Sequence, residues 1–147
     1  MRNPTLSSSR TGLTLIELVL VTAIMGLIAL IGIRELQRHF DRISARDAVR
    51  SAASVIARAR DEAVALHSPM SVHVDTVAAT LSIQGRGARL PLAALGTTHG
   101  VALSTSRVSI AFDVRGLGYG AANLTLVARR GSAAETLTVS RLGRVRY

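Results

Sequence analysis

The chain has 147 residues, its 18 basic residues are all arginine, and it carries a formal net charge of +9 with no cysteine. The lack of cysteine excludes disulfides and thiolate metal sites, and the length leaves room for one small domain beside a membrane segment. Residues 1–66 hold nine arginines and six acids, whereas residues 67–147 hold nine arginines and three acids. The more basic second half favours anionic partners such as phosphate backbones or acidic proteins.

The chain opens with a polar segment, residues 1–12, which contains two arginines and no acid. Such a segment is typical of a leader rather than of folded structure. An apolar run follows over residues 13–33, and Glu17 is its only charged residue. Because about 20 apolar residues cross a bilayer core as a helix, we predict a membrane-spanning helix. A carboxylate inside such a helix is costly and suggests a functional site.

Glu17 needs a partner if it lies within the membrane. If the chain is cut after Gly12, the new amino group of Leu13 lies near the same membrane face as Glu17. One helix cannot easily satisfy both groups, so the amine of a neighbouring subunit is an attractive partner. This reasoning favours polymerisation through packed helices. The alternative is a glutamate near the interface whose carboxylate reaches water.

The pattern after the apolar run predicts that the helix continues. Residues 34–66 contain no proline and no glycine. Small or apolar residues recur there at intervals of three and four, the spacing of one helix face: Val49, Ala52, Ile56, Ala59, Ala63 and Leu66. We therefore predict one helix over about residues 14–66, whose second part, residues 34–66, is amphipathic. Pro69 ends it, because the residue before a proline is disfavoured in the helical region.

The remaining segment, residues 67–147, shows short runs of alternating apolar and polar residues, which indicate strands. The expected strands are residues 71–77, 80–84, 101–104, 108–114, 123–129 and 135–141. Glycine-rich breaks separate them at residues 85–87, 116–120 and 130–132. We predict an α+β fold in which one antiparallel sheet packs on the second half of the long helix. The alanines on the helix stripe would let the sheet approach closely.

The string Gly-Leu-Thr-Leu-Ile-Glu-Leu at residues 12–18 resembles the type III signal of type IV pilins and type II secretion pseudopilins. The resemblance implies cleavage after Gly12 by a prepilin peptidase and N-methylation of the new terminus at Leu13. It also assigns to Glu17 the docking of the subunit into a growing filament. Leu13 departs from the phenylalanine that is usual at this position.

Three further segments, residues 57–63, 110–116 and 137–146, resemble the GspH/FimT group of minor pseudopilins, whereas residues 86–106 match no segment of the group. The resemblance implies a type IV pilin-like fold and a single pass through the bacterial inner membrane, with the C-terminal domain in the periplasm. Its implied partners are a prepilin peptidase and other pseudopilins or pilins in a filament. Arginine counts alone would place this domain in the cytoplasm. The resemblance implies the reverse, because the leader must face the peptidase on the cytoplasmic side of the membrane.

The basic C-terminus holds Arg141, Arg144 and Arg146. In a strand Arg144 and Arg146 point to one face, where two guanidinium groups could bind phosphates. Arginines in or near loops could widen this patch: Arg86, Arg89, Arg107, Arg129 and Arg130. In the FimT branch such an ending is associated with DNA capture by type IV pili. The alternative is a solubilising surface or a contact with the next subunit, and the scarcity of aromatics argues against base stacking.

These observations predict a minor pseudopilin of the type II secretion system, assembled near the tip of the pseudopilus. A first alternative is a FimT-like minor subunit of a type IV pilus that binds DNA. A second is a membrane-anchored binding module that never polymerises. We expect no enzyme, cofactor or metal, because the four histidines form no motif with a carboxylate and the glycines at residues 116–120 lack the context of a phosphate-binding loop.

Overall fold

The long helix, α1 (Leu15–Ala65), has 51 residues and lies within one residue at each end of the predicted helix over about residues 14–66. The structure is a computed structural model that describes residues 12, 14–85, 88–119 and 123–147, with the backbone alone for residues 88–92. It divides into two units, Met1–Leu36 and Gln37–Tyr147. The predicted leader lies outside the described residues except for Gly12.

The first unit contains the apolar part of α1. Its large apolar side chains, from Leu15 to Ile33, are all exposed. This part of the helix is the one candidate membrane span among the described residues, by length and composition, and no part of it is buried. An apolar helix without packing partners needs lipid or other helices around it, so this unit is consistent with membrane anchoring.

In the second unit, α1 presents a narrow face of small residues to the domain core. The buried residues of α1 are Ala45, Ala48, Val49, Ala52, Ile56, Ala59 and Ala63. The predicted stripe is therefore correct up to Ala63 and wrong at Leu66, whose side chain is 41% exposed. The reason is a Schellman turn: His67 has a φ of 45°, and the Ser68 amide donates to the Ala63 carbonyl at 3.2 Å. The helix thus ends before the stripe is complete.

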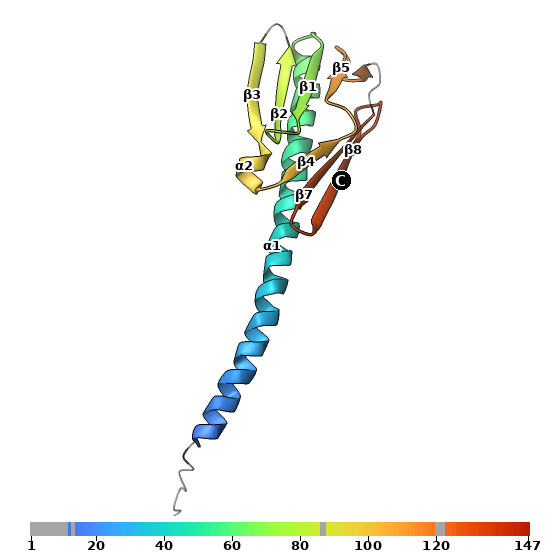
Figure 1. The fold of residues 1–147 in the computed structure, drawn as a ribbon. Helices are drawn as coiled ribbons and strands as arrows, with labels where there is room; N and C mark the ends of the chain where they lie inside the picture. Colours follow the sequence, from blue (N-terminus) through green and yellow to red (C-terminus); the bar gives the residue numbers. More distant parts are fainter. Residues whose placement is uncertain (1–11, 13, 86–87, 120–122) are drawn as a thin grey trace, which may run out of the picture. The chain divides into compact units, whose positions relative to one another are not determined.

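The strands form two antiparallel sheets rather than the one that was predicted (Figure 1). Sheet A has the order β3-β2-β1-β5-β6 and is built from β1 (Met70–Asp75), β2 (Thr80–Gly85), β3 (Ala88–Ala94), β5 (Ser109–Phe112) and β6 (Gly118–Tyr119). Sheet B has the order β4-β7-β8-β9 and is built from β4 (Ala102–Thr105), β7 (Leu124–Arg130), β8 (Ala133–Val139) and β9 (Val145–Arg146). A one-turn helix, α2 (Leu95–His99), joins the sheets in sequence.

Both sheets pack against the second half of α1 around one core. Phe112 of β5 is the largest fully buried side chain, and Leu126 and Leu137 contribute the neighbouring part of the core from sheet B. Alanines on the helix face let both sheets approach one helix closely, in keeping with the dense packing of protein interiors. The predicted fold class, a long helix packed on an antiparallel β domain, is confirmed.

Candidate functional site

The first candidate site lies at the start of α1. The Thr14 hydroxyl accepts a hydrogen bond from the Glu17 backbone amide at 3.3 Å. This Thr-x-x-Glu spacing is that of a capping box, which fixes where a helix begins. Glu17 is exposed in the first turn, where the partial positive charge of the helix terminus favours an acid. The capping role of Thr14 was not predicted, although its spacing from Glu17 carries the signal.

The predicted cleavage position is open. Gly12 is exposed, and among the described residues no atom lies within 4 Å of the place that a Cβ atom would take there. Leu13, the predicted first mature residue, lies outside the described residues. Gly12 thus precedes the capping residue Thr14 by two positions, and a protease could reach it without unwinding the helix.

The second candidate site begins with two hairpin turns of the same design. In sheet A the Gly116 amide donates to the Asp113 carbonyl at 2.9 Å, and Gly116 has a φ of 74°. In sheet B the Gly143 amide donates to the Ser140 carbonyl at 2.9 Å, and Gly143 has a φ of 72°. Each turn therefore ends in the left-handed conformation that glycine adopts without strain.

The two turns meet over the last part of α1. The Gly118 amide donates to the Arg141 carbonyl at 3.1 Å, which joins the two sheets. A Cβ atom on Gly116 would lie 3.2 Å from Cγ of Arg60, and one on Gly143 would lie 3.5 Å from its Cδ. The stem of the Arg60 side chain therefore packs beneath both turns. The three segments that resemble the GspH/FimT group thus meet at one place.

Asp113 stabilises the first of these turns. Its carboxylate accepts hydrogen bonds from the backbone amides of Leu117 at 2.8 Å and Arg115 at 2.9 Å, and it pairs with the Arg115 guanidinium at 3.0 Å. The amide of Leu117, followed by the contacts with Arg115, lowers the pKa of Asp113 below its ordinary value despite partial desolvation. The carboxylate thus stays charged in the folded protein at neutral pH.

The Ser140–Gly143 turn sets the orientation of the C-terminal arginines. After Gly143 the chain enters β9, where Arg146 pairs with Thr138, and Thr138 pairs in turn with Thr125 of β7. One row across the sheet is therefore Thr125–Thr138–Arg146. Arg144 lies opposite Ser140 in the turn that precedes β9, and its amide donates to Ser140 Oγ at 3.2 Å. Residues two apart on a strand share a face, so Arg144 and Arg146 both lie on the exposed side.

These residues line an open groove of about 460 Å³ on the outer face of sheet B. Its lining residues are Asn123, Leu124, Thr125, Thr138, Val139, Ser140, Leu142, Arg144 and Arg146. None of them is acidic, and among the described residues the guanidinium groups of Arg144 and Arg146 have no hydrogen bond or ion pair. Two such cations beside an amide and three hydroxyls form a surface suited to an anion. The hydroxyl rows depend on strand register, which sequence analysis did not give.

Arg141 does not join this groove. It lines a separate hollow of about 350 Å³ with Asp113, Arg115, Leu117, Gly118, Tyr119 and Leu142. The predicted trio of C-terminal arginines is therefore divided, with Arg141 on one side of the turn and the other two on the opposite side. The predicted strand over residues 135–141 ends at Val139 instead, which places Arg141 in the turn.

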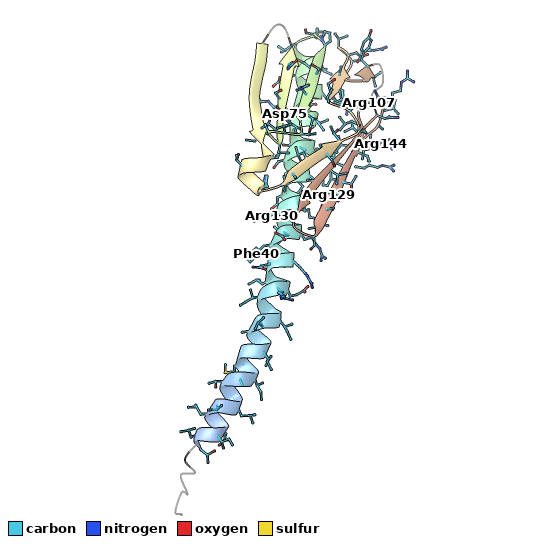
Figure 2. All side chains as sticks on the ribbon, in the orientation of Figure 1. Phe40, Asp75, Arg107, Arg129, Arg130 and Arg144 are labelled. Atoms are coloured by element: carbon cyan, nitrogen blue, oxygen red, sulfur yellow. The ribbon has the colours of Figure 1, made fainter. Side chains whose placement is uncertain are left out.

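The expected widening of the basic patch is wrong for Arg130. Its Nη1 atom donates to Ser44 Oγ and to the His99 carbonyl, both at 2.7 Å, and its Nε atom lies 3.2 Å from Oδ1 of Asp41. Arg130 therefore ties β7 to α1 and α2 (Figure 2). Arg129, the preceding residue, is exposed on the outer face of sheet B. Arg107 is exposed in the β4–β5 loop, Arg86 lies outside the described residues, and the side chain of Arg89 is not described.

The described residues contain no group of three or more side chains that could hold a metal ion. One serine–histidine pair is present, with Ser51 Oγ 3.3 Å from Nε2 of His99. This pair joins α1 to α2, next to the contacts of Arg130. The hydrogen bond between the two side chains is a structural contact, as expected for part-buried polar groups.

Comparison with known proteins agrees with this fold. The family model described as type II transport protein GspH matches residues 48–143. No curated protein matches the chain. The fold is similar to that of the type IV minor pilin FimU of Pseudomonas aeruginosa strain PAO1 in two crystal forms. One has a TM-score of 0.60 at 19% identity and covers 71% of this chain and 88% of that chain. The other has a TM-score of 0.56 at 19% identity and covers 69% and 90%. The chain thus has the type IV pilin fold.

Proposed function

Because the chain belongs to the GspH family of type II transport proteins, we propose that it is a minor pseudopilin of the type II protein secretion system. The pilin fold and the family support a structural subunit that assembles with other pilins or pseudopilins. The observation that carries the proposal is the wholly exposed apolar segment of α1, which has a capped start and a carboxylate in its first turn. Such a helix has no partners in its own chain among the described residues and is suited to pack with other subunits.

In this proposal a prepilin peptidase of the inner membrane cuts after Gly12, and the new terminus at Leu13 is methylated. The C-terminal domain lies in the periplasm. The new ammonium group lies next to Thr14, at the end of α1 that is already partially positive. A carboxylate from a neighbouring helix would neutralise it, and Glu17 is the acid at that level. The subunit then joins the pseudopilus near its tip and acts through assembly.

The experiment replaces Glu17 in the full chain, in bacteria that assemble the filament. Glu17→Gln removes the charge at constant size, and Thr14→Ala removes the helix cap but keeps the charge. We expect Glu17→Gln to be cleaved normally but to be missing from sheared filaments, and Thr14→Ala to be incorporated. Normal incorporation of Glu17→Gln would contradict the proposed role. A wild-type chain that stays uncut would favour a membrane anchor that never polymerises.

The groove on sheet B favours a second function, a FimT-like minor subunit of a type IV pilus that binds DNA. Its support is that Arg144 and Arg146 lie on one face, without a partner among the described residues and with no acid beside them in the groove. The test is DNA binding by the second unit, Gln37–Tyr147, across a salt series. Contacts to phosphates give affinity that falls steeply with salt, with a smaller slope when both arginines are replaced by alanine.

Arg50→Ala is the matched control, because Arg50 is exposed on α1 and does not line the groove. Loss of binding in the double variant with retention in the control would favour the pilus subunit. No binding at low salt would leave the arginines as surface or subunit contacts, and the secretion pseudopilin would stand.

A further inference from the structure

One edge of sheet B is covered over only part of its length. β7 pairs with β8 at all seven residues from Ala133 to Val139. On its other side, β8 pairs with β9 only at Thr138 and Val139. Among the described residues, no strand pairs with residues 133–137 on that side. This part of β8 is therefore an open edge.

The backbone groups of this edge point outward and are ready to pair. The Ser140 amide, one residue past β8, donates to the Arg144 carbonyl on the β9 side. Successive residues of an antiparallel strand direct their hydrogen-bonding groups to alternate sides. Thr138, Thr136 and Ala134 therefore direct theirs to this same side, and β9 satisfies only Thr138. Ala134 and Thr136 are exposed and leave a line of unused donors and acceptors.

The edges of sheet A are protected in ways that the β8 edge is not. The outer strand β3 contains Pro91, which lacks a backbone donor, and proline on an edge strand prevents pairing. The opposite edge strand, β6, has only two residues. The sequence of the open part of β8, Ala-Ala-Glu-Thr-Leu, has no proline and a single charge. An open strand edge without protection is a template for an added strand.

The charge of Glu135 selects the kind of strand that can bind. In the antiparallel register that uses both Ala134 and Thr136, a second copy would place Ala134 opposite Thr136 and Glu135 opposite the partner subunit's Glu135. Like charges directly opposite each other destabilise a strand pair. Within the described residues the Glu135 carboxylate has no partner. A strand with a lysine or arginine opposite Glu135 would provide one.

We propose that an extended segment of a different filament subunit adds to β8 at residues 133–136, with a basic side chain opposite Glu135. The added strand would lie in the line of β9 beyond Tyr147, which follows β9 along this edge. An acidic side chain opposite Thr136 would lie about 7 Å along the edge from Arg146 and within reach of its guanidinium. The partner is recognised through its backbone and this charge order. The proposal rests on the proposed function, since it takes the partner from the assembled filament.

The experiment uses the full chain in bacteria that assemble the filament, with a photo-crosslinking amino acid in place of Ala134. The expected adduct joins this chain to another pilin-like subunit, identified by mass spectrometry. The same probe at Thr125, on the outer face of the internal strand β7, is the control and is expected to give no such adduct. An adduct with a second copy, or no adduct at position 134 in assembled filaments, would overturn the inference.

Thr136→Pro tests the role of the backbone. Its amide points to the open edge, so proline leaves the pairing with β7 intact but removes one donor and blocks the added strand. We expect the adduct to fall by roughly tenfold, as the loss of one or two hydrogen bonds predicts, and to persist in Thr136→Val. Glu135→Arg is expected to give the same loss with no change in backbone. An adduct that both Thr136→Pro and Glu135→Arg leave unchanged would overturn the inference.

The two proposals fail in different ways. If the chain is present in sheared filaments but gives no adduct at position 134, the strand addition is overturned and the pseudopilin function stands. If the chain is absent from filaments, the pseudopilin function is overturned, and the strand addition with it.

Discussion

The backbone of Gly116 lies directly against Gly143: its carbonyl oxygen is 3.2 Å from the position that a Cβ atom on Gly143 would take. This contact joins a turn of sheet A to a turn of sheet B at the end of the core. Both glycines have a positive φ, so neither side of the contact accepts a side chain without strain.

The first prediction concerns Gly143. Gly143→Ala must hold a left-handed residue, which costs about 1–2 kcal/mol, and its methyl group would crowd the Gly116 carbonyl. Gly143→Asn should lose less, because asparagine tolerates this conformation. Thermal unfolding of the second unit should rank stability as glycine, asparagine, alanine. Equal stability of the alanine variant would show that the turn relaxes freely.

The second prediction concerns the pH dependence of the Asp113 turn. A carboxylate whose pKa is lowered on folding stabilises the protein above its unfolded pKa, and this contribution is lost as pH falls through the folded pKa. Asp113→Asn removes the charge but keeps an acceptor. We therefore expect wild type to be more stable than Asp113→Asn at neutral pH and the difference to vanish in acid. Melting temperatures from neutral pH down to below the ordinary range of an aspartate would test it, and a difference that persists there would contradict it.

The third prediction separates two adjacent arginines. Arg130→Gln should destabilise the second unit by roughly 1–2 kcal/mol, because it leaves Asp41 and the His99 carbonyl without their donor and the site is partly exposed. Arg129→Gln should leave stability unchanged, since its side chain lies on the surface. Denaturant unfolding of both variants makes the comparison. An equal loss of stability in Arg129→Gln and Arg130→Gln would mean that the loss of charge, rather than the loss of the contact with α1, is responsible.

The fourth prediction concerns processing at Gly12. Gly12→Val should block cleavage and leave an uncut band on a gel of bacterial membranes. No described residue crowds Gly12, so valine should leave the folded domain unchanged and a block would reflect recognition by the peptidase. Gly32→Ala, a glycine of α1 whose surroundings are also open, should be cleaved normally. Normal cleavage of Gly12→Val would place the cut elsewhere.

The long helix could be predicted because its pattern extends over many turns. Small and apolar residues that keep to intervals of three and four from Val49 to Ala63 fit one face of a helix and do not fit the alternation of a strand. The strands with clear alternation, such as β1 and β7, could be predicted for the same reason. β3 was missed because Pro91 interrupts its pattern, and β9 because two residues show no period.

The division into two sheets could not be predicted, since it depends on which strands pair across large distances in sequence. The same limit applies to the groove. The positions of Arg144 and Arg146 on one face follow from their spacing, but the hydroxyls beside them come from β7 and β8 and are known only from register. Arg130 is the opposite case. Its position near a loop suggested a free basic side chain, and nothing in the sequence indicates that it pairs with Asp41.

The cap on α1 has a consequence for maturation. Thr14 and Glu17 both lie after the proposed cut, so the hydrogen bond that starts the helix stays with the mature chain. Removal of the leader would take away two arginines and move the N-terminal amine to Leu13 without changing where the helix begins. Precursor and mature subunit would then share one secondary structure and differ in the charge at one membrane face. Competence for assembly would be an electrostatic property, acquired without refolding.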